Sequence, residues 1–447
     1  MLKAKNLYIL NKTDDFVRGE MDNVALDDNA ICLEQLAGRY VLYGCYTSPD
    51  VSLPPFTKLT MSWNAETPEG TVVEAQCRVF VEESWSPWLS CGKWSPYIKR
   101  AGEDGEEQKP AYIKDGMICI PGAKATRAQL RIYLYTDDER CTPLVRLLGA
   151  SVLPADWQKE EAKPYGRLLR LPAYSQNLRD PQLRPYMDSP VMLTSLLNRW
   201  GQDILPEELA LAMFDHGRQG CQNHSFAVAA AGTYGYEAFL AYLDPARVWE
   251  HIKAGESVAL ELNYAASEEE QKETGLPLLP GSFAGGKHQF MPLRGFELDD
   301  QGEIYALVND GHAPNNRAAE TRYPAKDIWE AYSGLALLVS GFHPNRQEGS
   351  PIRRHCGLNP LNEVGCYMFQ DAENNELPLP EDFSGSIAAA VQDGTAWATT
   401  AHKSFVYLNK AEDGSIQLPP EVIQPGRKIT VYAIGPSGST LVGQINL

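Results

Sequence analysis

The stretch that decides the fold is Met187-Asp188-Ser189-Pro190-Val191-Met192-Leu193-Thr194-Ser195-Leu196-Leu197, in the middle of the chain. Ser189 followed by Pro190 is typical of a helix start, because serine caps free backbone N–H groups and proline fits the first turn. Apolar residues then recur at helical spacing as far as Trp200, and Gly201 ends the pattern. The sequence therefore predicts a helix capped by Ser189, with Asp188 directly before it.

Helices and strands follow one another beyond this stretch. Asp244-Pro245 is a helix start, and residues 257–262 have the composition of a strand. Two further strand-like runs, 290–298 and 303–309, flank Asp299-Asp300-Gln301-Gly302, which is a hairpin signal. We therefore predict an α+β domain over residues 165–342.

The flanking parts of the chain show strand patterns. In residues 73–81, apolar and polar residues alternate, and short turn-forming stretches interrupt such runs throughout residues 1–155, which predicts a β-sandwich. Strand-like runs at 366–369, 404–408 and 428–434 predict a small immunoglobulin-like β-sandwich over residues 361–447. A length of 447 residues is consistent with three domains.

The composition excludes several function classes. With 40 basic and 58 acidic residues the net charge is −18, and no basic cluster is present to follow a phosphate backbone, so nucleic acid is not expected as a partner. No apolar run is long enough to span a membrane, and no secretory signal precedes Asp14, so we expect a cytoplasmic protein. Nine dispersed cysteines without a Cys-x-x-Cys pair fit reduced thiols.

Four features with complementary chemistry occur in a fixed order. Gln176 precedes the predicted helix start at Asp188, and His288 and Asp310 follow on the two strands of the predicted hairpin, which would bring them to within a few residues of each other. A side-chain amide can donate to an oxyanion, a helix N-terminus lowers the pKa of a thiol, a histidine accepts its proton and an acid orients the histidine. This order is that of a papain-like cysteine hydrolase.

Several stretches resemble the bacterial peptidase C39-like proteins, which are papain-fold relatives of bacteriocin-leader peptidases. The resemblance covers about residues 15–340 and implies a papain-like domain preceded by the β-sandwich that many members carry. The stretches are Tyr174-Ser175-Gln176, Met187-Asp188-Ser189-Pro190, Trp200-Gly201, Gln222-Asn223-His224-Ser225-Phe226, Lys287-His288-Gln289-Phe290, Arg294-Gly295-Phe296, Val308-Asn309-Asp310, and the tryptophan-rich segments around Trp63, Trp85 and Trp94.

One departure changes the functional expectation. The family has its nucleophilic cysteine where this chain has Asp188. A carboxylate cannot replace a thiolate in peptide cleavage, because its attack on an amide would form an anhydride that is more reactive than the substrate. We therefore expect an inactive or weakened cysteine-peptidase homologue that keeps a peptide-binding cleft, with Gln176, Asp188, His288 and Asp310 as its site residues and with no cofactor.

Three alternatives remain open at this stage. Cys221 with His224 could supply a substitute nucleophile for a peptidase or amidase, and Asp188, His288 and Asp310 could bind a metal ion such as zinc. The tryptophans of the first domain, Trp63, Trp85, Trp88 and Trp94, could stack on sugar rings in a glycan-binding or adaptor protein. Packing is the more common role of such a cysteine and of these tryptophans, and we favour a hydrogen-bonded Asp–His–Asp cluster without a metal over a metal site.

Overall fold

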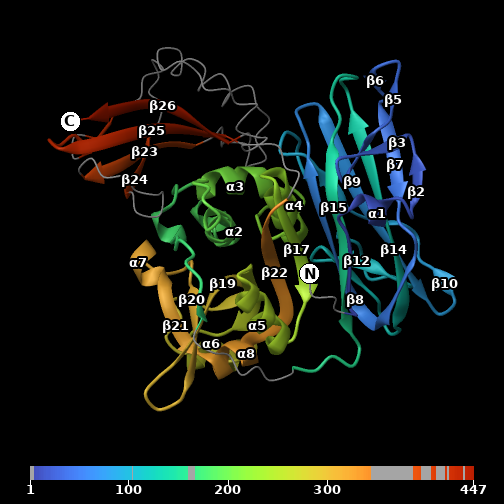
Figure 1. Cartoon of the computed structure of the whole chain (residues 1–447). Coiled ribbons are helices and arrows are strands. Elements are labelled where there is room, and N and C mark those ends of the chain that lie inside the picture. Colours follow the sequence, from blue (N-terminus) through green and yellow to red (C-terminus); the bar gives the residue numbers. More distant parts are fainter. Residues whose placement is uncertain are drawn as a thin grey trace.

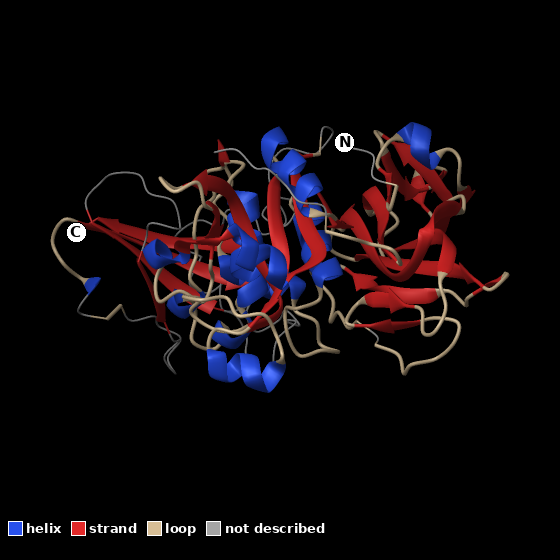
Figure 2. Cartoon of the chain, turned by 90° about the horizontal axis from the view of Figure 1, so that it is seen from below, coloured by secondary structure: helices blue, strands red, loops and turns tan. Residues whose placement is uncertain are grey.

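Three sheets lie in a row in the computed structural model, with the helix-rich part in the middle (Figures 1 and 2). The structure describes residues 5–102, 104–159, 167–343, 386–393, 404–408, 418–419, 422–435 and 438–446. Strands dominate, and the helices are concentrated in residues 167–343. None of the helices in these ranges is long and apolar enough to cross a membrane.

The N-terminal part is an antiparallel β structure built on four long strands, β8 (Val51–Glu66), β9 (Thr71–Val81), β14 (Ala125–Thr136) and β15 (Leu144–Pro154). Its strand order is β10-β9-β14-β8-β15-β4-β3, and β8 and β14 each pair with several neighbours, so the sheet curls into a sandwich-like or barrel-like body. Every second side chain of β9 is buried, as the alternation predicts. The remaining elements are β1 (Leu7–Leu10), α1 (Thr13–Phe16), β2 (Glu20–Asp22), β3 (Val24–Asp27), β4 (Ala30–Leu33), β5 (Gln35–Leu36), β6 (Arg39–Tyr40), β7 (Tyr43–Thr47), β10 (Ser84–Trp85), β11 (Leu89–Trp94), β12 (Tyr112–Lys114) and β13 (Met117–Cys119).

The middle part is an antiparallel sheet with helices packed against it. Its strand order is β17-β22-β18-β19-β20-β21, with the short β16 (Arg167–Leu168) on β19. The strands are β17 (Tyr236–Tyr242), β18 (Ser257–Tyr264), β19 (Gly286–Leu298), β20 (Ile304–Asn309), β21 (Glu320–Pro324) and β22 (Tyr332–Phe342). The helices are η1 (Gln176–Leu178), η2 (Arg184–Tyr186), α2 (Asp188–Asn198), α3 (Pro206–Met213), α4 (His224–Thr233), α5 (Pro245–Ala254), α6 (Glu268–Thr274), α7 (Asn316–Ala319) and α8 (Ala325–Ala331). Helix α2 packs on β18 and β19, which places the start of this helix beside the hairpin.

Most of the predicted elements of this part are confirmed, with one correction. The hairpin of β19 and β20 forms, and α5 begins after Asp244, whose side chain accepts a hydrogen bond from the Arg247 N–H. Helix α2 begins two residues earlier than predicted, however, because Met187 rather than Ser189 is the cap residue and Asp188 is already helical. Ser189 is a buried residue of the first turn. The papain-like arrangement itself remains a prediction.

At the interface between the N-terminal and middle parts, polar side chains of one part hydrogen-bond the backbone of the other. Asn64 of β8 accepts a hydrogen bond from the Ala238 N–H (3.1 Å) and donates to the Ala238 carbonyl (2.9 Å), and Ser62 accepts one from the Leu240 N–H (2.9 Å). These bonds satisfy backbone groups of the buried strand β17 that pair with no strand on that side. The backbones also approach closely, since a Cβ atom on Gly232 of α4 would lie 2.5 Å from the Asn64 Cα. The two parts are therefore held in a fixed relation.

The C-terminal part is a four-stranded sheet in the order β24-β23-β25-β26. Its strands are β23 (Ser386–Asp393), β24 (Ser404–Leu408), β25 (Arg427–Gly435) and β26 (Gly438–Asn446), so the strands predicted at 404–408 and 428–434 are confirmed. The strand predicted at 366–369 lies outside the described residues. Only a single sheet, without a second layer, is present in the described residues of this part. The predicted immunoglobulin-like sandwich and the domain limits 1–155, 165–342 and 361–447 remain predictions.

Candidate functional site

Asp188 lies at the first position of α2 and contacts the hairpin across from it. The Gln289 side-chain Nε2 donates to its Oδ1 at 3.4 Å. Burial raises the pKa of Asp188 to about 6, and the charge of Asp310 adds to this effect, while His312 and the Gln289 hydrogen bond act against it. Asp188 is therefore a carboxyl group that takes up a proton at a higher pH than an ordinary aspartate does.

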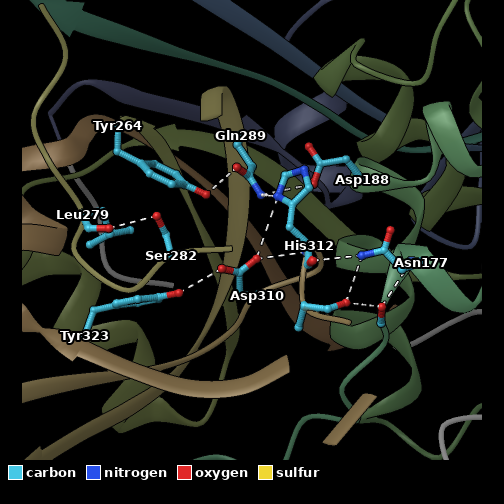
Figure 3. A network of polar contacts seen from close by, with 11 residues as sticks. Asn177, Asp188, Tyr264, Leu279, Ser282, Gln289, Asp310, His312 and Tyr323 are labelled. Atoms are coloured by element: carbon cyan, nitrogen blue, oxygen red, sulfur yellow. Dashed lines mark hydrogen bonds and ion pairs between the residues drawn. The ribbon is translucent and has the colours of Figure 1, made fainter. Parts of the chain in front are cut away.

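Gln289, not His288, is the β19 residue that faces Asp188. Its amide also donates to His312 Nδ1 (2.7 Å), and its Oε1 accepts a hydrogen bond from the Tyr264 hydroxyl (2.6 Å), as Figure 3 shows. These three hydrogen bonds use both the NH2 group and the oxygen of the Gln289 amide. A primary amide has no basic lone pair at neutral pH, so Gln289 cannot remove a proton from a neighbouring group.

Asp310 is fully buried behind this amide. It accepts hydrogen bonds from the Tyr323 hydroxyl (2.9 Å) and from the backbone N–H of His312 (2.9 Å), and the His312 Nδ1 lies 3.8 Å from its Oδ1 (Figure 3). The acid therefore orients a histidine, but that histidine is His312, which follows it by two residues. His312 was not among the predicted site residues, although it lies only two residues after Asp310 in the sequence.

His288 does not pair with Asp310, and this prediction was wrong. Its Nδ1 lies 3.2 Å from Glu261 Oε1, and its backbone N–H donates to Asn263 Oδ1 at 2.9 Å. The cause is a bulge in β19, because Leu262 pairs with Gln289 whereas Tyr264 pairs with Gly286, leaving two residues of β19 opposite Asn263. His288 adopts a left-handed backbone with φ of +55°, which an alternating strand pattern cannot indicate.

Glu261 and His288 form a second polar pair next to Asp188. Glu261 is buried and also bonds Ser333 Oγ, and the buried His224 lies 3.7 Å away through its Nε2. Burial raises the pKa of Glu261, but the hydrogen bond and charge of His288, together with His224 and Ser333, hold it below its usual value. The Glu261 hydrogen bond raises the pKa of His288, whereas burial lowers that of His224 to about 4. His288 is the half-buried, more accessible member of the pair, and it is the one whose positive charge is favoured.

Gln176 is the first residue of η1, which contacts the segment 311–313 next to Asp310. Its backbone N–H donates to the Gly311 carbonyl at 2.9 Å, and the adjacent Asn177 side chain donates to the carbonyls of His312 and Ala313. The structure thus brings the Gln176 segment to the loop that carries His312. Its side-chain amide makes no hydrogen bond to a described residue.

A pocket of about 540 Å³ opens beside Asp188. Its walls include residues of the N-terminal part (Asp115 and Met117), the loop 217–222, and the middle sheet (Glu261 and His288). Pockets of this size are typical of small-ligand and side-chain binding sites. Asp188 and His288 therefore share a pocket, even though they do not bond each other.

The alternatives for a nucleophile or a metal receive no support. Cys221 lines the pocket but is 1% exposed, its Sγ contacts the Ala210 carbonyl, and burial raises the pKa of its thiol far above the usual value, so it stays protonated. The proposed ligands Asp188, His288 and Asp310 do not converge. No group of three or more His, Cys, Asp or Glu residues within the described ranges is arranged to hold a metal ion.

The tryptophans of the N-terminal part already have partners on their rings. The Arg78 guanidinium lies 4.7 Å from the ring centroids of both Trp85 and Trp88, and Arg131 lies 3.9 Å from that of Trp88. Trp63 and Trp94 are fully buried at the interface with the middle part. These contacts are those of packing residues and leave little free ring surface for a sugar.

Comparison with known proteins relates the N-terminal part to a peptidase family. Residues 9–152 match the family model of the Peptidase C39 N-terminal domain. None of the curated proteins matches the chain.

Two solved structures show weak similarity. One is described under "Prominent members of the human gut microbiota express endo-acting O-glycanases to initiate mucin breakdown", with 11% identity, coverage of 34% of this chain and 93% of that chain, and a TM-score of 0.20. The other is the Clostridium thermocellum endo-1,4-beta-D-xylanase 10B, with its CBM22-1-GH10 modules complexed with xylohexaose, at 8% identity, coverage of 39% and 29%, and a TM-score of 0.17. At these scores neither similarity bears on the function.

Proposed function

We propose that this chain, related to the Peptidase C39 proteins through residues 9–152, carries in its middle part a papain-like, cysteine-peptidase-type domain that binds peptides without hydrolysing them. The order of elements supports the assignment: a loop with Gln176, a helix start at Asp188, and a hairpin whose second strand is followed by a buried Asp310. The matched N-terminal part also fits the arrangement that the sequence resemblance implies.

The main observation that argues against hydrolysis is the contact between Asp188 and Gln289 at the helix start. Cleavage by this type of site needs a thiolate at the helix N-terminus and a base across from it. Both positions hold groups that cannot do this chemistry, a carboxyl and an amide. His288, which could act as a base, bonds Glu261 instead.

The pocket beside Asp188 supports the retained binding. It is open, contains a protonatable carboxyl group and the half-buried His288, and is enclosed partly by the N-terminal part. A bound peptide side chain would therefore contact both parts of the chain at once. Because the two parts are fixed relative to each other, the pocket is formed before the ligand arrives, which lowers the entropic cost of binding.

A peptide library tests binding. Biotinylated random peptides are captured by the full-length protein, and retained peptides are identified by mass spectrometry. Gly220 lines the pocket, and a Cβ atom there would meet only the Arg218 carbonyl oxygen at 3.9 Å, so Gly220→Ala should retain binding whereas Gly220→Trp should fill the pocket and abolish it. Equal retention by the tryptophan and alanine variants, both folded by circular dichroism, would rule out this pocket as the peptide site.

A further inference from the structure

A second cavity lies at the opposite end of α2 from Asp188. It measures about 950 Å³ and is bordered by residues 168–173, Leu178, the C-terminal end of α2 with Asn198 and Arg199, Arg294 of β19, the α7 region, and Phe405 of the C-terminal sheet. The 11-residue helix α2 lies between this cavity and Asp188, and at 1.5 Å per residue its two ends are about 16 Å apart. We call this cavity the arginine groove, and it has no part in the function proposed above.

The groove concentrates positive charge in a strongly acidic protein. Five arginines line it, Arg170, Arg179, Arg199, Arg294 and Arg317, against a single acidic residue, Glu320, whereas the whole chain has a net charge of −18. Glu320 lies 3.2 Å from Arg294, and Glu207, outside the groove, lies 3.6 Å from Arg179. The other three arginines have no carboxylate partner among the described residues.

Buried guanidinium donors without a hydrogen-bond partner point to a ligand. Arg179 has a side chain only 1% exposed, and its Nη1 faces Glu207 Oε2 at 3.6 Å, yet its Nε has no hydrogen-bond partner within the described part of the chain. The same holds for Nε of Arg294, whose side chain is 14% exposed. Unpaired buried donors are costly, and a negatively charged acceptor in the groove would satisfy them.

The apolar residues that line the arginine groove favour an anion that also carries apolar groups. Leu168 and Leu178 are 53% and 43% exposed at the groove, and Leu169, Leu171 and Pro172 line it beside them. A highly hydrated phosphate or sulfate chain would leave these apolar surfaces unused. A peptide that carries both carboxylates and apolar side chains would use both kinds of surface, and arginine pairs well with carboxylates through two parallel hydrogen bonds.

We propose that the arginine groove binds an acidic peptide segment that also carries apolar residues. Its carboxylates would lie against Arg170, Arg294 and Arg317, and its apolar side chains against Leu168 and Leu178. This inference stands apart from the peptide pocket beside Asp188 and can fail without affecting it.

The probe is a fluorescein-labelled decapeptide of alternating Glu and Leu, titrated with the full-length protein and followed by fluorescence anisotropy. Arg170 and Arg317 are exposed, so replacing both by glutamate leaves the buried packing intact. The control is Arg18→Glu with Lys326→Glu, two exposed positions outside the groove that change the net charge by the same amount.

We expect the wild type to bind the peptide with an affinity that falls as NaCl is added. The affinity should fall at least about tenfold in the variant that combines Arg170→Glu with Arg317→Glu, and it should be unchanged in the control pair. A decapeptide of alternating Gln and Leu should bind at least about tenfold more weakly. Equal affinity of both double variants would overturn the proposal. It would also be overturned if a heparin oligosaccharide bound more tightly than the Glu-Leu peptide and lost affinity in the groove variant, since the ligand would then be an anionic glycan.

Discussion

Replacing Asp188 by asparagine should stabilise the protein, and more so at alkaline pH. The carboxyl group is partly buried at the start of α2 next to Gln289, and its pKa is raised to about 6 mainly by burial. Asparagine has nearly the same shape, and its carbonyl oxygen can still accept the hydrogen bond from Gln289 Nε2. The substitution therefore removes the charge and little else.

The magnitude follows from the two pKa values. An aspartate has an ordinary pKa of 3.8, so a value of about 6 in the folded protein means that folding with an ionised Asp188 costs up to about 3 kcal/mol. For an acid with a raised pKa, this penalty is complete above the folded pKa and disappears as the pH falls toward 3.8. Linkage gives an advantage of Asp188→Asn over the wild type of about 3 kcal/mol at pH 8 and roughly half of that at pH 5.

Urea unfolding at the two pH values, followed by tryptophan fluorescence, measures the difference. The control is Asp300→Asn, because Asp300 is exposed in the hairpin turn and makes no ion pair with a described residue. An Asp188→Asn variant that is less stable than the wild type at pH 8, or that has the same advantage at both pH values, would refute the claim that Asp188 is held in a site that disfavours its charge.

Three further predictions follow from other contacts. Asp188→Cys alone should remain inactive against peptides, whereas Asp188→Cys combined with Gln289→His, which supplies a base across from the thiol, should gain iodoacetamide-sensitive cleavage in a fluorogenic peptide assay; activity of the single variant equal to that of the double would contradict the role given to Gln289. Asn64→Ala should lower the free energy of unfolding by about 2–5 kcal/mol, because both the N–H and the carbonyl of Ala238 lose their buried partner; chemical denaturation measures this, and a loss below about 1 kcal/mol would contradict it. Cys221 should stay unmodified by iodoacetamide in the native protein, as peptide mapping would reveal, and rapid labelling would contradict its assignment as a buried thiol.

Local patterns predicted much of the secondary structure. The alternation of residues 73–81 matches the burial of β9, and the Asp244-Pro245 start and the positive φ of Gly255 mark the two ends of α5. The hairpin turn after Leu298 is also where the sequence places it. These features depend on residues close together in the chain, so composition and spacing are sufficient to predict them.

The candidate site depended on features that spacing cannot reveal. The bulge opposite Asn263 places Gln289 instead of His288 beside Asp188, and nothing in the alternation of residues 286–298 signals it. Glu261, on the neighbouring strand, pairs with the His288 side chain, and these two residues are far apart in sequence. The position of Asp188 at a helix start was predicted, but its partners depended on strand register.

Hydrolysis by the wild-type protein is the most direct test of the central claim. The full-length chain at high concentration is incubated with a mixture of random peptides at pH 5 to 8, and mass spectrometry counts new peptide termini against an Asp188→Ala variant prepared in the same way. The account predicts that peptides are retained intact and that no new termini appear. New termini that form with the wild type and are absent with Asp188→Ala would contradict it, because Asp188 would then take part in cleavage.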